Sequence, residues 1–172
     1  LTPRLSYFEF LADAIISQQL SKNAADTISQ RFRKLFSVTR ITPKSFLSLS
    51  ADEVLNSGLS RRKYESLVDL AKAVESKKLR LSDFNGEKDD VIRVALKSIK
   101  GIGDWTVDMF LIFGLARLDV LPIHDLALRK VIADVYHMNQ DDLKIITQIA
   151  ERWKPYRSVA CWYLYKYRNK KA

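Results

Sequence analysis

The sequence predicts an all-α fold on three observations. Apolar residues recur at the three- and four-residue spacing of a helix along most of the chain, and no segment shows a convincing two-residue alternation. Serine stands directly before several of these apolar stripes, where its side chain can cap a helix. Gly58, Pro122 and Pro155 stand at borders between stripes, where a helix stops or starts.

Two helices are predicted within residues 6–36. Ser6 and Glu9 have the spacing of a capping box, and the helix behind them ends near Gln19. The helical pattern restarts at Ser21. The apolar face of the first helix is formed by Phe10, Leu11, Ala14 and Ile15, and that of the second by Ala24, Ala25, Ile28, Phe32, Leu35 and Phe36.

Two more helices are predicted between residues 50 and 75. Ser50 and Glu53 cap a short helix that stops near Gly58. Ser60 is the expected N-cap of the next helix, whose first turn is crowded with basic residues. The apolar face of that helix is formed by Tyr64, Leu67, Ala71 and Val74.

The second half of the chain continues the helical pattern. After a loop over residues 81–89, a helix over about residues 90–98 leads into two closely spaced glycines. The stretch "WTVDMFLIFGLARL", residues 105–118, is apolar nearly all round, which is typical of a buried central helix. Helices are predicted over about 125–136 and 141–153, and a segment from Arg157 closes the chain.

Composition limits the classes of function. The 172 residues fit one domain or two small lobes, and 47% hydrophobic residues are ample for a core. Lys and Arg number 29 against 20 Asp and Glu, and the net charge of +9 favours a polyanionic partner, with nucleic acid first. The single cysteine, Cys161, excludes an internal disulfide framework and indicates a reducing compartment. We expect no membrane span and no targeting segment.

The two glycines, Gly101 and Gly103, lie in "KSIKGIGDWTV" between two helical patterns. Glycine tolerates positive φ and allows another backbone to approach closely, so a tight helix-hairpin-helix over residues 96–106 is predicted. The N–H groups from Gly103 to Thr106 would then be unpaired and able to bind a phosphate. An ordinary helix-to-helix turn that uses two glycines is the alternative.

The surrounding residues carry a family resemblance. The stretch from 96 to 130 resembles the helix-hairpin-helix DNA glycosylases that have a catalytic aspartate downstream of the hairpin. The combination of "AIISQQLS", "GLSRRK", "GIGDWT", "DVLPIHDLALRK" and "ERWKPYRSVACWY" is similar to the alkylbase branch, the AlkA and Mag type of 3-methyladenine DNA glycosylase, closest to the short fungal Mag-like members. This resemblance implies one domain over residues 1–172, built as two helical lobes with a cleft that receives a flipped-out nucleotide.

By the same resemblance, Asp125 corresponds to the catalytic aspartate. Hydrolysis of an N-glycosidic bond passes through an oxocarbenium-like sugar, and a buried carboxylate can stabilise that cation and orient or deprotonate water. From the sequence without the resemblance, Asp125 is instead an ordinary N-cap after Pro122.

Three aromatic residues are expected to line the base pocket: Trp105, Tyr156 and Trp153. An electron-poor alkylated base is recognised by stacking on aromatic faces, and Tyr156 corresponds to the family's stacking residue. Trp105 stands where bifunctional relatives have a Schiff-base lysine, so no lyase activity is expected from that position, although Lys100 and Lys130 stay open as amines. Burial in the core is the alternative for Trp105.

DNA contacts are expected from the loop after the first helix, from helix starts and from the hairpin. Gln19 is the expected wedge in the minor groove, with Leu20 behind it, while Ser21 either faces the groove or only caps the second helix. The other residues expected to bind DNA are Lys22, Arg62, Lys63, Lys100, Gly101, Ile102, Gly103 and Thr106.

The resemblance also implies an activity, a partner and a place. The expected activity is monofunctional excision of alkylated purines from duplex DNA, by a monomer that acts in the nucleus if eukaryotic and otherwise in the cytoplasm. No side-chain metal site and no cofactor are expected, although the hairpin carbonyls could hold a monovalent cation. Ser21 is small and His124 adds positive charge beside Asp125. Both favour an alternative, a glycosylase-like protein that binds abasic or distorted DNA with little or no excision.

Overall fold

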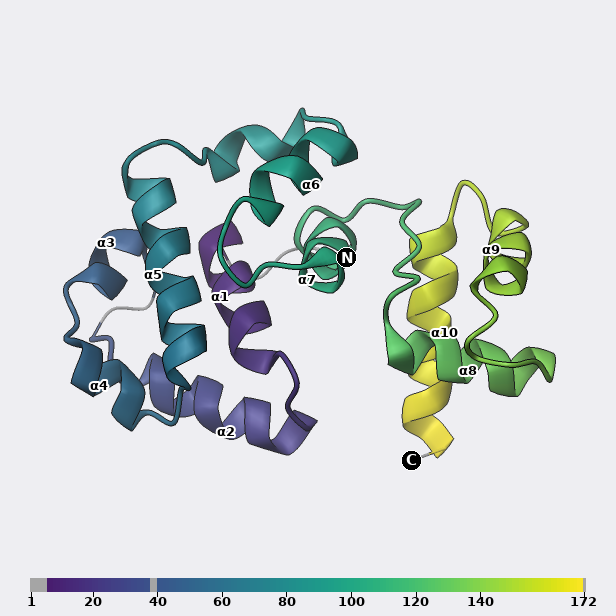
Figure 1. Cartoon of the computed structure of the whole chain (residues 1–172), viewed down its shortest axis with the longest axis horizontal. Helices are drawn as coiled ribbons and strands as arrows, with labels where there is room; N and C mark the ends of the chain where they lie inside the picture. Colours follow the sequence, from purple (N-terminus) through teal and green to yellow (C-terminus); the bar gives the residue numbers. More distant parts are fainter. Residues whose placement is uncertain (1–5, 38–39, 172) are drawn as a thin grey trace.

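The computed structural model describes residues 6–37 and 40–171, except for the side chains of Lys22 and residues 169–171. Within these residues every regular element is helical, which confirms the predicted all-α fold. The helices form two lobes joined by an extended connection (Figure 1). The first lobe holds α1 (Tyr7–Ser17), α2 (Lys22–Arg33), α3 (Pro43–Leu47), α4 (Ala51–Asn56), α5 (Arg61–Glu75), the 3₁₀ turn η1 (Leu81–Asn85), α6 (Asp89–Lys97), α7 (Asp104–Met109) and the π-helical turn η2 (Phe110–Gly114); the second holds α8 (Leu126–Tyr136), α9 (Leu143–Glu151) and α10 (Arg157–Lys171).

The core of the first lobe is built around α1. This helix packs against α2, α5, α7 and η2, and its apolar stripe is fully buried at Leu11, Ile15 and Ile16. Leu67 of α5 and Phe110 of η2 are also fully buried in this cluster. Because α1 lies in the middle of the lobe, the loop that follows it is carried to the side that faces the second lobe (Figure 1).

Serine caps begin four of the described helices, α1, α2, α4 and α5. Ser6 with Glu9 and Ser50 with Glu53 form complete capping boxes at α1 and α4. The hydroxyl oxygens of Ser21 and Ser60 accept hydrogen bonds from the N–H groups three residues later. Each cap satisfies a backbone donor that has no partner inside the helix, so the starts of these helices are fixed by local chemistry.

The structure differs from the sequence-based elements in three places. The α3 helix was not predicted, although Thr42 caps it and Pro43 occupies its first position. The expected loop over residues 81–89 contains η1. The central helix does not run to residue 118, because it changes into a π turn that ends at Gly114. A Cβ at Gly114 would lie 2.7 Å from the Phe110 ring, so the tight π turn requires glycine there.

The second lobe has a smaller core of its own. Leu128, Ile132, Ile146 and Cys161 are fully buried at the junction of its three helices. The thiol of Cys161 is buried, and burial, with a smaller contribution from Asp125, raises its pKa to about 12.

Residues 115–125 connect the lobes and are held at both ends. Arg117 donates from its guanidinium to the carbonyl oxygens of Phe84 and Glu87, at 3.1 and 2.6 Å. Further along, the Asp119 carboxylate accepts from the Arg157 guanidinium at 2.7 and 2.9 Å, and Arg157 holds the pKa of Asp119 below its usual range. The connection is therefore fastened to the first lobe and then to the start of α10.

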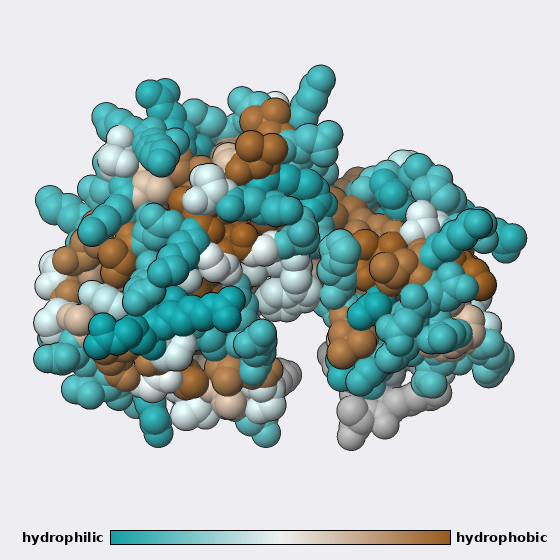
Figure 2. All heavy atoms as spheres, viewed as in Figure 1, coloured by the Kyte–Doolittle hydropathy of each residue, from teal (hydrophilic) through white to brown (hydrophobic). Residues whose placement is uncertain are grey.

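The space-filling view shows a notch between the lobes, open on the side opposite the connection (Figure 2). No helix in the described part of the chain is long and apolar enough to span a bilayer.

Candidate active-site cleft

A cavity of about 830 Å³ lies between the two lobes. The first lobe supplies the loop between α1 and α2, the start of α5 and the hairpin before α7; the second supplies the start of α8 and one side chain of α10. The lining residues are Ser17, Gln18, Gln19, Leu20, Ser60, Arg62, Lys63, Gly101, Ile102, Gly103, Trp105, Thr106, Asp125, Leu126, Ala127, Lys130 and Arg168.

Asp125 is the one acidic residue of that lining, and only 7% of its surface is exposed. It is the N-cap of α8, reached through a turn in which its N–H donates to the Pro122 carbonyl. Its Oδ1 accepts from the N–H groups of Ala127 and Leu128 at 2.7 and 3.1 Å. Asp125 therefore caps α8, as expected from the sequence alone. The cap fixes its carboxylate at the start of α8, where it lines the cavity.

The other carboxylate oxygen of Asp125 receives two side-chain donors. The indole Nε1 of Trp105, from α7, lies 2.9 Å from Oδ2, and the hydroxyl of Tyr165, from α10, lies 2.8 Å from it. Burial and the neighbouring Asp125 raise the pKa of Tyr165, so its hydroxyl stays a proton donor. A carboxylate has about four lone-pair positions, and here four donors occupy them.

The hairpin turn is shaped by a left-handed glycine. Gly101 has φ +81°, and a Cβ there would lie 2.2 Å from Ser66 Oγ of α5. The N–H of Ile102 donates back to Ile99, but the N–H groups of Gly103, Asp104 and Trp105 have no acceptor among the described residues. Unpaired amides at a helix start favour an anion, so the phosphate-binding arrangement expected from the sequence is available.

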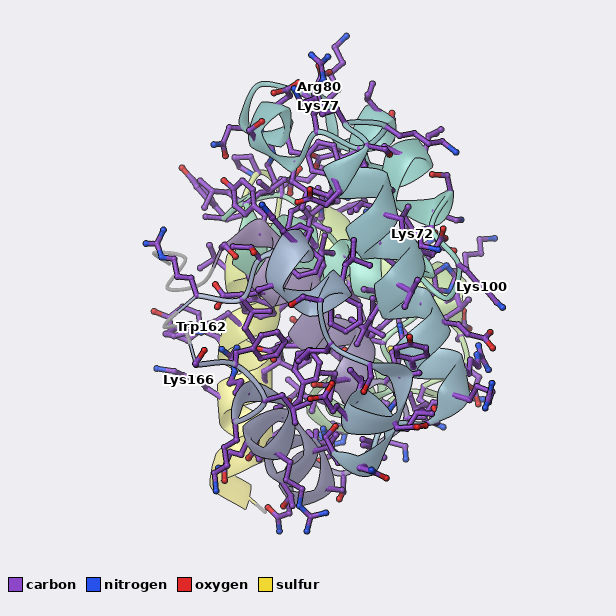
Figure 3. The ribbon with its side chains drawn as sticks, turned by 90° about the vertical axis from the view of Figure 1, so that its left-hand side faces the viewer. Lys72, Lys77, Arg80, Lys100, Trp162 and Lys166 are labelled. Carbon is purple, nitrogen blue, oxygen red and sulfur yellow. The ribbon has the colours of Figure 1, made fainter. Side chains whose placement is uncertain are left out.

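Charges beside the hairpin are paired rather than free. Lys100 Nζ lies 2.6 Å from Glu65 Oε2, and its N–H donates to Asp69. Figure 3 places Lys100 at the outer edge of the molecule, beside α5 and on the same side as Lys72. Lys100 is therefore next to the hairpin but outside the cavity lining. Asp104, at the start of α7, pairs with Lys97 at 2.8 Å, which offsets a negative charge near the free amides.

The loop between α1 and α2 is tied to the hairpin. Gln18 Nε2 donates to the Gly101 carbonyl at 3.0 Å and to Thr106 Oγ1 at 2.9 Å. The next residue, Gln19, is exposed and has φ +56°, so the chain turns sharply toward the opening. Lys63 Nζ donates to the carbonyl of Ile16 at the end of α1, and burial lowers the pKa of Lys63. The loop and the hairpin therefore form one edge of the cavity.

Several predicted site residues are placed differently. Trp153 and Tyr156 are not among the residues that line this cavity: Trp153 packs against the second core and against Tyr136, while Tyr156 is 55% exposed. The pattern could not show this, because only the turn before α10 sets which way that segment faces. Their part in a base pocket stays a prediction. Thr106 lines the cavity, and its buried side chain accepts a hydrogen bond from Gln18. A phosphate contact through its N–H stays a prediction.

The remaining predicted contacts divide into three groups. Gln19, Leu20, Arg62, Lys63, Gly101 and Gly103 line the cavity, and their contact with DNA stays a prediction. Ile102 lines it too, but its side chain is buried in the first core. Ser21 caps α2, and a contact of Ser21 with the groove, which is compatible with the cap, stays a prediction. The side chain of Lys22 lies outside the described residues.

The sequence did not predict that Gln18, Lys130 and Arg168 line the cavity, or that Tyr165 contacts Asp125. Tyr165 follows Ser158 and Cys161 at helical spacing, so the buried stripe of α10 was visible as a signal. Gln18 gave no such signal, because its partners lie more than 80 positions away in the sequence. No local pattern marked Arg168 either, although it lines the cavity. No group of three or more His, Cys, Asp or Glu side chains in the described residues could hold a metal ion.

Known proteins match this chain both in sequence and in fold. The family model described as HhH-GPD superfamily base excision DNA repair protein matches residues 12–155. DNA-3-methyladenine glycosylase 1 of Schizosaccharomyces pombe is 33% identical over 92% of this chain and 71% of its own. The structure of S. pombe Mag1 in complex with abasic DNA superposes with a TM-score of 0.88 at 30% identity, covering 96% of this chain and 84% of that one. A DNA-3-methyladenine glycosidase from Bacillus halodurans gives 0.85 at 34% identity, over 96% and 77%.

Proposed function

This chain belongs to the HhH-GPD superfamily of base excision DNA repair proteins, and from that membership and the cleft we infer which reaction it performs. It is a DNA glycosylase of the 3-methyladenine type, as its relatives are named. We propose that it binds duplex DNA across the cleft, receives a flipped-out alkylated purine nucleotide and hydrolyses its N-glycosidic bond. The observation that carries the proposal is Asp125, which is buried and held by four hydrogen bonds in the lining of a cavity that both lobes form.

Hydrolysis of this N-glycosidic bond requires no catalytic group besides the Asp125 carboxylate. The bond between C1′ and the purine nitrogen breaks with its electron pair on the base, and an alkylated, positively charged purine is already a good leaving group. The sugar becomes oxocarbenium-like, and Asp125 stabilises that positive charge. Water then adds at C1′ and loses a proton to the solvent, which leaves the neutral abasic sugar. Because four donors fix Asp125 in place, its charge is oriented before the sugar arrives.

The base is proposed to lie against Trp105, the one aromatic side chain of the lining. The apolar residues of the lining include Leu20 and Leu126, whose side chains supply no hydrogen-bond pattern. Such a surface supports selection by the electron-poor ring rather than by base identity.

The DNA strand is proposed to be gripped by the free amides from Gly103 to Trp105, with Gln19 and Leu20 filling the space left by the flipped nucleotide. The protein is proposed to act as a monomer, and in the nucleus if it comes from a eukaryote. A monovalent cation on the hairpin carbonyls also stays a proposal. One of those carbonyls, that of Gly101, already accepts from Gln18.

The test is single-turnover excision with protein in excess over a duplex that contains methylated purines. Wild type should release free base and leave an intact strand that breaks only on heating in alkali. Asp125→Asn should lose at least about a hundredfold in rate, because the charge that stabilises the cation is gone, while it still binds an abasic-site analogue. Tight binding by wild type without base release would contradict the proposal and support the non-excising alternative. His124, which favoured that alternative, is exposed and outside the cavity lining.

Borohydride trapping tests the absence of lyase activity. Lys63 and Lys130 are the amines that line the cavity, whereas Lys100 is paired at the outer edge. A covalent protein–DNA adduct after reduction would show that one of the two forms an imine with the abasic sugar, and the monofunctional assignment would be wrong.

A further inference from the structure

We propose that Tyr165 is a positioning residue for Asp125, which acts by holding one carboxylate oxygen in the orientation that faces the sugar. The inference rests on the proposed function, because it gives the tyrosine a part in the same excision reaction. It concerns the hydroxyl of a partly buried tyrosine on α10, a helix whose other aromatic residues pack or lie exposed.

The two oxygens of Asp125 are held in different ways. Oδ1 is held by main-chain N–H groups of α8, the helix that Asp125 itself begins. Oδ2 is held only by side chains, Trp105 at 2.9 Å and Tyr165 at 2.8 Å. Main-chain donors fix the position of Oδ1, whereas the torsion angle of the carboxylate depends on what holds Oδ2.

The two donors to Oδ2 come from opposite sides of the cleft. Trp105 packs against the first core, and Tyr165 packs against the second. The Tyr165 ring lies 6.5 Å from that of Phe113, which belongs to the first lobe, so it is wedged at the junction of the two lobes. Trp105 also lines the cavity, where the base would lie, but Tyr165 does not. Tyr165 therefore acts on the reaction only through Asp125.

The hydroxyl is a donor suited to this task. Burial and the neighbouring carboxylate raise the pKa of Tyr165, so no loss of its proton interrupts the bond at ordinary pH. A hydrogen bond to a charged group is stronger than one between neutral groups, so this bond favours one carboxylate orientation over others.

The variant Tyr165→Phe removes the donor and leaves the ring. Its matched control is Tyr163→Phe on the same helix, because Tyr163 is 64% exposed and its hydroxyl is absent from the Asp125 network. We expect the single-turnover rate of methylated-purine excision to fall about tenfold for Tyr165→Phe, since one of two donors to Oδ2 is lost, and to be unchanged for Tyr163→Phe. Affinity for a tetrahydrofuran abasic-site duplex should be unchanged in both variants.

The same change in an Asp125→Asn background separates positioning from packing. If the hydroxyl acts through the carboxylate, Tyr165→Phe should cause no further loss of the residual rate once that carboxylate is absent. A purely structural hydroxyl would lower the thermal midpoint and reduce the rate by the same factor in both backgrounds. That result would overturn the proposal.

The outcomes also distinguish this inference from the proposed function. If wild type and Tyr165→Phe release base at the same rate, the positioning role is refuted and the glycosylase assignment stands. Wild type that releases no base refutes the glycosylase assignment first.

Discussion

Gly101 and Gly103 stand two positions apart in the hairpin, but their surroundings differ. Gly101 has a left-handed backbone, and the space where a side chain would begin is filled by Ser66 of α5. Gly103 has φ −106°, which any residue adopts, and nothing lies within 4 Å of the place where its Cβ would be. The first glycine is therefore required by the fold, while the second leaves room over the free amides.

Alanine at each position should separate these roles. Gly101→Ala should lower the free energy of unfolding by about 2–4 kcal/mol, from the strained backbone and the clash with Ser66. Gly103→Ala should leave stability nearly unchanged and weaken binding to abasic-site DNA, because a methyl group would stand where the strand approaches. Urea denaturation and fluorescence anisotropy measure the two effects. Equal stability of both variants would show that the turn relaxes around the added carbon.

At the start of α1, one side chain takes part both in the helix cap and in a contact with a distant segment. Glu9 completes the capping box through Ser6, and its other oxygen accepts from the N–H of Ile41 at 3.0 Å. Burial alone would raise the pKa of Glu9, but the hydrogen bonds from Ile41 and Ser6 and the charge of Arg33 bring it below its ordinary value of 4.5. One carboxylate thus joins the start of α1 to the segment before α3.

Glu9→Gln should lower the free energy of unfolding at pH 7 by about 1–3 kcal/mol, because the charged acceptor of a buried N–H is lost. Since the folded pKa of Glu9 lies below the unfolded one, its contribution is complete above the unfolded value of 4.5 and disappears as pH falls through the folded pKa. Thermal unfolding of wild type and variant should therefore converge in acid. Glu53→Gln, which has the same cap but no tertiary acceptor role, should lose less stability at pH 7.

Helices and turns that are determined by residues close together in the chain could be predicted from the sequence. Serine caps and apolar stripes gave most helices, and the glycine pair gave the hairpin, because neighbours in the chain determine both. The π turn at Gly114 was not predictable, because it depends on the fit of the Phe110 ring inside the packed lobe.

The site was predictable only in part. Asp125 was identified through the residues around it in sequence, but Tyr165 is 40 positions away from it. The Gln18 contact with Gly101 spans 83 positions. Contacts of this kind are decided by how the two lobes meet, and no local pattern encodes that arrangement.

At the scale of the whole molecule, cations from both lobes surround the cleft. Arg62 and Lys63 come from α5 of the first lobe, and Lys130 and Arg168 from α8 and α10 of the second. A duplex that spans the cleft would therefore meet positive charge on either side of the flipped nucleotide. By contrast, Lys72 lies on α5 outside this lining, on the opposite side of the view from Trp162 and Lys166 (Figure 3).

Removing the cations of the second lobe should weaken DNA binding and reduce its dependence on salt. Lys130→Ala and Arg168→Ala should each lower the slope of log K against log salt by about 0.9, the value for one phosphate contact. Lys72→Ala is the matched control and should leave the slope unchanged. Anisotropy titrations of an abasic-site duplex over a series of salt concentrations measure it. If Lys72→Ala lowers the slope as much as the other two variants do, the cations of the cleft contribute no more to DNA binding than a cation outside it.

The burial of Cys161 has a practical consequence for work on the two lobes. Nucleophilic attack on a maleimide requires a thiolate at the surface, and this thiol is enclosed, with its pKa raised to about 12. Cysteines introduced at exposed positions such as Leu47 and Tyr163 can accordingly be labelled with a pair of dyes while the native thiol stays unmodified. Energy transfer between the dyes would then report, in real time, whether the lobes close when a damaged duplex arrives.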